Sequence, residues 1–214
     1  MSFSEELLDA NRGWWDTWQP HPFTRAVAEQ TVDPELFNGW LAQDYLFVRE
    51  GMRFLAILLT KAPVALVDPL ADTITTWRTE LELFRTQARA AGVELDVAPR
   101  FVTRTYTSFL MSVGHQQPFL VGWSVLYGVE KSYHDAWRWV AEQIGPDHPQ
   151  APWVNNWGSE TFAEFTRFLA RTLDELTLNV SADTLQAART YFTHTAELEF
   201  LFWEMALGRD FGTA

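Results

Sequence analysis

The stretch DPELFNGWLAQDYLFVREGMRFLAILLTK, residues 33–61, decides the fold class of this chain. Asp33 followed by Pro34 is typical of a helix start, because an aspartate can cap exposed backbone N–H groups and proline suits the first helical position. Apolar residues then recur three or four positions apart, which is the period of a helix and not of a strand. The stretch predicts one long amphipathic helix from Pro34 to Lys61.

The same period continues along most of the chain, and prolines and glycines fall mainly between the periodic segments. We therefore predict an all-α protein with no internal repeat or linker, folded as a single domain over residues 1–214. Ser4 is expected to cap the first helix, Gly92 to end the fourth, and residues 157–159 to kink the seventh. The predicted helices span about residues 4–18, 23–30, 34–61, 64–91, 98–113, 118–144, 151–178 and 181–207.

The composition excludes several classes of function. The chain has 214 residues, 47% of them hydrophobic, which is enough for one large core. A net charge of −12 without any basic cluster predicts that neither nucleic acid nor an anionic membrane surface is a partner. The absence of cysteine excludes disulfides, thiolate metal ligands and a cysteine nucleophile. No signal-like segment or membrane-spanning run is recognised, so a cytoplasmic location is expected.

Two carboxylates interrupt apolar, aromatic helical runs: Asp44 in QDYLF and Glu199 in LEFLFW. A carboxylate in an apolar interior costs several kcal/mol unless it is paired, hydrogen-bonded or protonated. Acids in such runs therefore indicate a site that binds and protonates a polar ligand. The alternative is that both acids face solvent or pair with Arg49, Arg53 or Arg209.

Several short motifs occur in a fixed order along the chain. They are HPF at 21–23, Phe37, QDY at 43–45, YTS at 106–108 and EFLFWEMA at 199–206. Together they resemble the thiaminase II (TenA-like) family over residues 15 to 207, and the lack of cysteine resembles its TenA_E branch. The resemblance implies a haem-oxygenase-like helical bundle without haem, assembled as a homo-oligomer, either a tetramer or a dimer.

The family resemblance also implies an activity. Its enzymes hydrolyse aminopyrimidines, removing the amine from aminomethyl-pyrimidine breakdown products of thiamin. The chain is accordingly expected to be a C–N hydrolase of thiamin salvage, an aminopyrimidine aminohydrolase with a pyrimidine substrate, no cofactor and no metal. The TenA_E branch is credited with acting on aminopyrimidines rather than with efficient cleavage of thiamin itself.

The resemblance assigns roles to individual residues. Asp44 matches the aspartate that holds the pyrimidine amino group, and Glu199 matches the glutamate that protonates a ring nitrogen. Tyr106 falls on a tyrosine of the motif and Phe202 on an aromatic wall. His21, at a helix start, is interpreted as a structural residue that caps or packs.

Other positions depart from the family pattern. Trp157 falls on a tyrosine of a Tyr-Gly-Gly turn and Phe47 replaces another pocket tyrosine, which makes the pocket less polar. Ser124 stands where the catalytic cysteine is expected. Tyr127 and Glu130 follow Ser124 on the same predicted helix and are expected to line the site.

Removal of the amine from an aminomethyl pyrimidine requires a ring that withdraws electrons, a nucleophile, and a proton for the departing amine. If an aromatic shell raises the pKa of Glu199, this residue can protonate the ring while ionised Asp44 accepts a hydrogen bond from the exocyclic amine. Ser124 can attack only if a base such as Glu130, Asp44 or His134 reaches it. Attack by water, with a carboxylate as base, is the alternative.

Two other functions remain open. One is a pyrimidine-binding protein that has lost turnover together with the cysteine. The other is a haem-oxygenase-like di-metal oxidase, because acids and histidines at helical spacing can bind iron or manganese. The candidate metal ligands are Glu130 with His134, His194 with Glu197, and Glu50 and Glu80.

Overall fold

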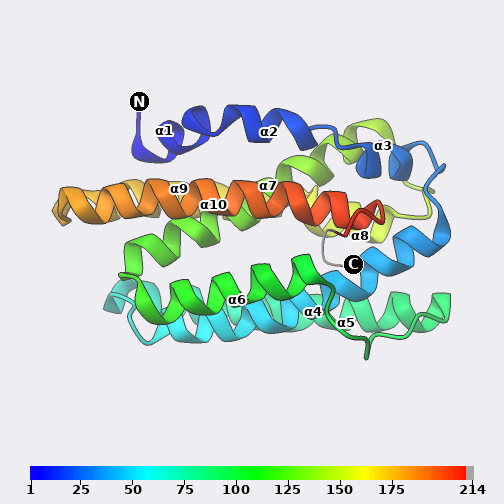
Figure 1. Cartoon of the computed structure of the whole chain (residues 1–214), viewed down its shortest axis with the longest axis horizontal. Helices are drawn as coiled ribbons and strands as arrows, with labels where there is room; N and C mark the ends of the chain where they lie inside the picture. The colour runs from blue at the N-terminus through cyan, green and yellow to red at the C-terminus, as the bar shows by residue number, and fades with distance from the viewer. Residues whose placement is uncertain (211–214) are drawn as a thin grey trace. The chain divides into compact units, whose positions relative to one another are not determined.

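The computed structural model describes residues 1–210, and these form helices with no strand (Figure 1). The predicted all-α class is confirmed. None of the described helices is long and apolar enough to cross a bilayer. The α-helices are α1 Phe3–Ala10, α2 Arg12–Trp18, α3 Pro22–Ala28, α4 Pro34–Leu59, α5 Val67–Ala91, α6 Phe101–Gln116, α7 Phe119–Gln143, α8 Ala151–Trp157, α9 Glu160–Leu176 and α10 Ala182–Ala206, with short 3-10 turns at Val64–Leu66 and Thr177–Asn179.

The chain divides into two compact units. Unit 1 comprises Met1–Val32 and Trp123–Trp203, and unit 2 comprises Asp33–Gly122 and Glu204–Ala214. Helices α7 and α10 each continue from one unit into the other. The single domain expected over residues 1–214 stays a prediction.

Unit 2 is built around the long helix α4. As predicted, its first turn is capped by Asp33, whose Oδ1 accepts a hydrogen bond from the Glu35 backbone N–H at 2.8 Å. The apolar side of the helix is buried, with Phe54 and Leu58 at most 1% exposed. Helices α5 and α6 pack against this helix. The helix thus buries the face that its sequence period predicted.

Helix α5 approaches α4 closely at Gly51. A Cβ atom at this glycine would lie 2.3 Å from Cζ3 of Trp77, so only a glycine leaves room for the indole. Trp77 is 5% exposed. The next connection begins where α5 ends at Gly92, whose φ of 69° closes the helix as predicted.

Unit 1 is built around helices α7, α9 and α10. Gly128 of α7 lies against Thr195 of α10, and further along both helices Tyr133 stacks on Trp203 with ring centroids 5.2 Å apart. Contacts that advance together along both helices show that α7 and α10 run parallel. Helices α1 and α2 contact α10: Glu6 of α1 pairs with Arg189, and Trp15 of α2 stacks on Phe192 with ring centroids 5.6 Å apart.

Two predicted helix boundaries are wrong at the N-terminus. The first helix is capped by Ser2 and not by Ser4, because Ser2 and Glu5 form a reciprocal capping box. Ser4 instead donates its hydroxyl to Asp174 at 2.9 Å. The predicted continuous helix through Trp18 is broken at Asn11, whose side chain bonds the Leu7 carbonyl at 2.8 Å and competes with the helical ladder.

Two further boundaries differ from the sequence prediction. Residues 151–178 are not one kinked helix but two, α8 and α9, since Ser159 caps a new helix by accepting from the Phe162 N–H at 3.2 Å. Helix α6 begins at Phe101, three residues later than expected, after Arg100 in extended conformation. His21, interpreted as a structural residue that caps or packs, caps α3, because its side chain accepts a hydrogen bond from the Phe23 N–H.

Candidate active site

Asp44 lies on α4 in unit 2 and is 1% exposed. Its two neighbours in sequence tie α4 to different helices. Gln43 accepts a hydrogen bond from Thr103 of α6 at 2.8 Å, and Tyr45 accepts one from Arg85 of α5 at 3.1 Å. Because successive helical residues are about 100° apart, Asp44 points into the sector of α4 between its contacts with α5 and α6.

An aromatic pair joins α4 to α6 one turn after Asp44. Phe47, one turn after Asp44 on the same side of α4, packs on Tyr106 of α6 with ring centroids 4.7 Å apart and planes tilted by 51°. Phe47 is 4% and Tyr106 1% exposed. Two of the residues predicted for the site, Phe47 and Tyr106, are therefore in contact within unit 2.

Glu199 lies on α10 in unit 1 and is also 1% exposed. One turn earlier, Thr195 contacts α7, because a Cβ atom at Gly128 would lie 3.0 Å from its Cγ2. Residues one turn apart share a helical face. Glu199 therefore lies on the face of α10 that packs against α7.

Ser124 lies on α7 and is fully buried. It precedes Gly128 by one turn, so it lies on the face of α7 that packs against α10. Because the two helices run parallel, Ser124 lies one turn before the contact between Gly128 and Thr195, and Glu199 lies one turn after it. The two residues are separated along the helices by about 11 Å, two helical turns.

Five aromatic rings of unit 1 form a continuous chain of ring contacts. Trp157 stacks on Trp153 and Trp137 with ring centroids 5.5 Å and 5.4 Å apart. Tyr133 meets the Trp157 ring edge-on at 5.3 Å and stacks on Trp203 at 5.2 Å. We call these five residues the aromatic wall of unit 1. The predicted site residue Trp157 belongs to it, and Phe202, 1% exposed, immediately precedes Trp203.

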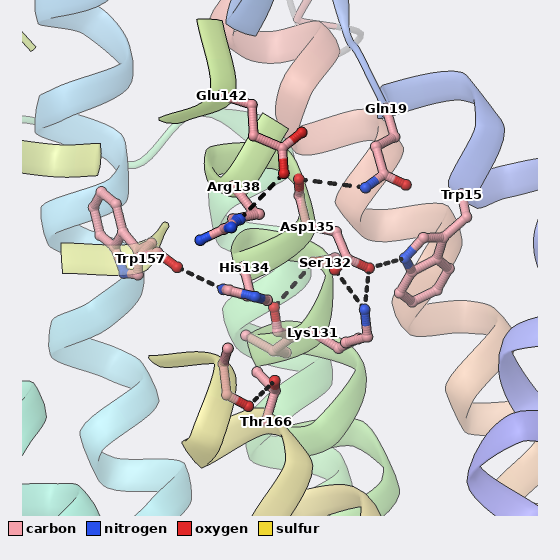
Figure 2. A network of polar contacts seen from close by, with 12 residues as sticks. Trp15, Gln19, Lys131, Ser132, His134, Asp135, Arg138, Glu142, Trp157 and Thr166 are labelled. Carbon is pink, nitrogen blue, oxygen red and sulfur yellow. Dashed lines mark hydrogen bonds and ion pairs between the residues drawn. The ribbon is translucent and has the colours of Figure 1, made fainter. Parts of the chain in front are cut away.

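A hydrogen bond joins the C-terminal end of α8 to α7. Figure 2 shows this contact between His134 and the Trp157 carbonyl. His134 Nδ1 lies 2.8 Å from the Trp157 carbonyl oxygen and donates its proton to it, since a carbonyl can only accept. A Cβ atom at Gly158 would lie 2.8 Å from the Trp137 carbonyl oxygen. The position of the Trp157 backbone is thus fixed by two contacts with α7.

Tyr127 packs within unit 1 against Phe192 of α10, with ring centroids 6.0 Å apart. Burial raises the pKa of the Tyr127 phenol well above its usual range, and the negative charges of Asp135, Asp174 and Glu5 raise it further. The phenol is therefore protonated at neutral pH and can donate a hydrogen bond but cannot act as a base.

Glu130 is 4% exposed and lies on a different side of α7 from the one that packs against α10. His134, one turn after Glu130 on the same side of α7, bonds the Trp157 carbonyl of α8. Trp123, two turns before Glu130 on this side, donates its indole N–H to the Leu169 carbonyl of α9 at 3.0 Å. Glu130 thus lies on the side of α7 that faces α8 and α9. Six positions separate it from Ser124, so the two side chains leave α7 in directions about 120° apart.

The predicted site residues are distributed over both units. Asp44, Phe47 and Tyr106 belong to unit 2, and the others belong to unit 1. The convergence of Asp44 with Glu199 on one ligand stays a prediction.

One polar network was missed by the sequence interpretation. Asp135 of α7 accepts a hydrogen bond from the Trp15 indole at 3.0 Å, and Lys131 binds both of its carboxylate oxygens (Figure 2). The spacing of Lys131 and Asp135, four residues apart on a helix, could have indicated the ion pair. The network ties α2 to α7.

The ligands suggested for a di-metal oxidase do not gather into a metal site. Within residues 1–210, no group of three or more histidine, aspartate or glutamate side chains is placed to hold a metal ion. Glu130 and His134 are therefore not part of such a group, and His134 Nδ1 already bonds the Trp157 carbonyl.

Comparison with known proteins identifies the relatives of this chain. Residues 8–209 match the TENA/THI-4/PQQC family. A protein of Halalkalibacterium halodurans named aminopyrimidine aminohydrolase is 25% identical, with 96% of each chain covered. A protein of Glycine max named probable bifunctional TENA-E protein is 24% identical, with 97% of this chain and 94% of that protein covered.

Solved structures agree with this assignment. A TenA homologue from Pyrococcus furiosus has a TM-score of 0.93 and 34% identity, covering 95% of this chain and 99% of that one. A domain from Shewanella denitrificans with a heme oxygenase-like fold has a TM-score of 0.75 at 12% identity, covering 95% and 91%, and bears on the fold alone. The predicted haem-oxygenase-like fold is confirmed. With nearly its whole length matched, the chain belongs to the TENA/THI-4/PQQC family.

Proposed function

We propose that this protein is an aminopyrimidine aminohydrolase, which replaces the amino group of an aminomethyl pyrimidine by a hydroxyl group. The observation that carries the proposal is the burial of Asp44 and Glu199, each 1% exposed within apolar, aromatic helices. Buried carboxylates suit a polar heterocycle that offers both a hydrogen-bond donor and a basic nitrogen. Membership of the family and the name of the relative from H. halodurans support the same activity.

The two acids have different tasks in this proposal. Asp44 is ionised and accepts a hydrogen bond from the exocyclic ring amine, which fixes the orientation of the ring. Glu199 donates a proton to a ring nitrogen, which withdraws electrons from the ring and activates the methylene carbon toward a nucleophile. The oxygen of water bonds to this carbon, the C–N bond breaks, and the amine leaves as ammonia with a proton from the water. The ring nitrogen then returns its proton to Glu199, which restores the acid.

Water is the nucleophile that we favour over Ser124. Ser124 needs an adjacent base to attack at neutral pH. Glu199 lies about two turns away along the paired helices, and Glu130 leaves α7 on another side. The role of Ser124 as a nucleophile stays a prediction, and so do the roles of Tyr106, Phe47, Tyr127, Trp157, Phe202 and Glu130 in binding the ring.

Substitution of the two acids tests the proposal. We expect Glu199→Gln and Asp44→Asn each to lower kcat for ammonia release from 4-amino-5-aminomethyl-2-methylpyrimidine by about 10²-fold or more, the range of a lost acid–base group. Glu197→Gln, on the same helix but partly exposed, is the matched control and should retain activity. Unchanged rates in both site variants would refute the assigned roles, and a wild-type protein that binds the pyrimidine without forming product would be a binding protein.

Ser124→Ala separates the two nucleophiles. With water as the nucleophile, this variant should keep its rate within about tenfold of the wild type, whereas loss of a covalent nucleophile costs several orders of magnitude. A far-ultraviolet circular dichroism spectrum and a melting curve would show that the variant is folded. A rate reduced to background in a folded variant would restore Ser124 as the nucleophile.

The predicted surroundings of the reaction complete the proposal. We expect the enzyme to assemble as a homotetramer or a homodimer, because the family resemblance implies such an assembly. The cytoplasmic location stays a prediction. Light scattering of the purified protein during size-exclusion chromatography would determine the assembly. A monomer at micromolar concentration would contradict this expectation.

A further inference from the structure

Unit 2 contains a groove that the proposed reaction does not use. The groove lies between α4 and α6 and has a volume of about 390 Å³. Arg49 and Glu50 of α4 and Arg104 and Ser108 of α6 contribute its polar groups. Leu46 contributes an apolar wall and is only 3% exposed. We call this cavity the α4–α6 groove.

The α4–α6 groove opens on a different side of α4 from Asp44. Successive helical residues are about 100° apart. Arg49 therefore lies roughly 140° around α4 from Asp44 in one direction, and Glu50 lies roughly 120° from Asp44 in the other direction. Asp44 points into the sector between α5 and α6, whereas the groove residues occupy the outer side of the helix. A ligand in the groove would therefore not occupy the place of the proposed substrate next to Asp44.

The groove is locally basic although the whole chain has a net charge of −12. Glu50 is shared by two arginines, with Oε2 at 2.8 Å from Arg53 Nη1 and Oε1 at 3.5 Å from Arg49 Nε. One carboxylate therefore faces both guanidinium groups on α4. In an acidic protein, such a local excess of positive charge attracts small anions to one place.

Arg104 adds a second basic group from the opposite wall. Its guanidinium carbon lies 5.9 Å from the centroid of the Phe101 ring, and within residues 1–210 it forms no ion pair. Among the residues that line the groove, Arg49 and Arg104 are basic and Glu50 is acidic, an excess of one positive charge. Arg53, outside the lining, also pairs with Glu50.

We propose that the α4–α6 groove binds a small organic phosphate. A phosphate ester is an anion at neutral pH, and the positive excess of the lining residues attracts it. Guanidinium groups bind phosphate oxygens through paired N–H donors, and Arg49 and Arg104 can approach the anion from the two walls. The Ser108 hydroxyl is an additional donor, and Leu46 packs against the organic part of the ligand.

Titration calorimetry with phenyl phosphate tests this proposal, at constant ionic strength so that screening of charges does not vary. Wild-type protein should bind phenyl phosphate saturably, at one site per chain, and more tightly than inorganic phosphate because of the apolar contact. Benzoate, which has the same ring but a single charge, should bind more weakly. Equal affinity for benzoate and phenyl phosphate would overturn the choice of phosphate.

Variants locate the binding site. Arg49→Gln and Arg104→Gln should each weaken phenyl phosphate binding by about tenfold or more, the effect of losing a charged hydrogen-bond donor. Arg167→Gln, an exposed arginine on α9 in unit 1, is the matched control and should leave the affinity unchanged. Ser108→Asp places a negative charge at the exposed rim and should abolish binding without disturbing the core.

The outcome is independent of the proposed enzyme activity. Asp44→Asn should bind phenyl phosphate as the wild type does, because Asp44 faces another sector of α4. Arg104→Gln should keep the basal rate of amine release. Absence of saturable binding, equal binding by the wild type and both arginine variants, or loss of binding in Asp44→Asn would each refute the groove as an anion site.

Discussion

At the scale of single residues, Tyr127 has a protonation state that its surroundings determine. Burial and three nearby carboxylates raise the pKa of its phenol, so the folded protein holds this proton to higher pH than the unfolded chain does. Its contribution to stability is therefore complete below the unfolded pKa of about 10 and is lost as the pH rises through the folded pKa.

We expect Tyr127→Phe to change the pH dependence of unfolding. Because phenylalanine has no proton to lose, the free energy of unfolding of the variant should fall less steeply above about pH 10 than that of the wild type. Urea denaturation at pH 8 and at pH 11 measures the difference. Tyr191→Phe, which removes a partly exposed phenol from α10, is the matched control. Parallel curves for wild type and Tyr127→Phe would show that this phenol does not contribute.

Gly158 supports a second prediction at this scale. A Cβ atom there would meet the carbonyl oxygens of Trp137 and Val154 at 2.8 Å and 2.9 Å, and backbone atoms cannot move aside as a flexible side chain can. Gly158→Ala should lower the free energy of unfolding by about 1–3 kcal/mol. Chemical denaturation measures this change. Gly13→Ala, at a helical glycine with no atom within 4 Å, should be neutral or stabilising, and equal effects at both positions would contradict the argument.

At the scale of elements, α1 is attached to α10 by an ion pair whose strength depends on pH. The Arg189 guanidinium donates to Glu6 through Nε at 2.6 Å and Nη2 at 3.2 Å and lowers the pKa of that carboxyl. A lowered pKa stabilises the fold above the unfolded pKa of about 4.3, and this contribution is lost as the pH falls through the lower folded value.

We expect Glu6→Gln to be slightly destabilising at pH 7 and nearly neutral at acidic pH. Both side chains are more than one third exposed, so solvent screening limits the effect to about 0.5 kcal/mol at pH 7. Urea denaturation at pH 7 and at pH 3 compares the variant with the wild type and with Glu164→Gln, an exposed control on α9. If Glu6→Gln were more destabilising at pH 3 than at pH 7, the ion pair could not be the cause of the destabilisation.

The sequence predicted elements well where a single local signal dominates. Helix α4 was recognised because Asp33 and Pro34 act within its first turn and its apolar period is unbroken. The break at Asn11 was not recognised, because it depends on a side-chain bond to the Leu7 carbonyl that the apolar period does not reveal. The start of α9 is a new helix and not the predicted kink, and the residue type of Ser159, which suits a cap, is the local signal for it.

The residues of the candidate site were predictable to a similar extent. Buried acids in apolar runs could be found from the sequence, and Asp44 and Glu199 are indeed buried. Sequence spacing also placed Ser124, Tyr127 and Glu130 on one helix, but the directions of their side chains depend on which helices pack around α7. Such packing involves residues far apart in the chain, and the period of one helix contains no information about it.

At the scale of the whole molecule, the two compact units share continuous helices. Because α7 and α10 each run from one unit into the other, unfolding one unit would remove hydrogen-bonded turns from a helix that also belongs to the other. This arrangement favours a single cooperative transition over two separate ones.

We expect calorimetry to detect one unfolding transition. The calorimetric enthalpy should equal the van't Hoff enthalpy for the protein, or for its cooperative assembly if it is an oligomer. The measurement is differential scanning calorimetry at several protein concentrations. Two resolved transitions would show that the units unfold independently and would contradict the single domain expected from the sequence.

The aromatic wall of unit 1 has a consequence for spectroscopy. Trp157 stacks on Trp153 and on Trp137 with ring centroids 5.5 Å and 5.4 Å apart, so the electronic transitions of these indoles are coupled rather than independent. Excitation of one indole should spread to its neighbours, and the near-ultraviolet dichroism of the folded protein should be dominated by this group. An optical signal of this kind would report directly on the order of the rings.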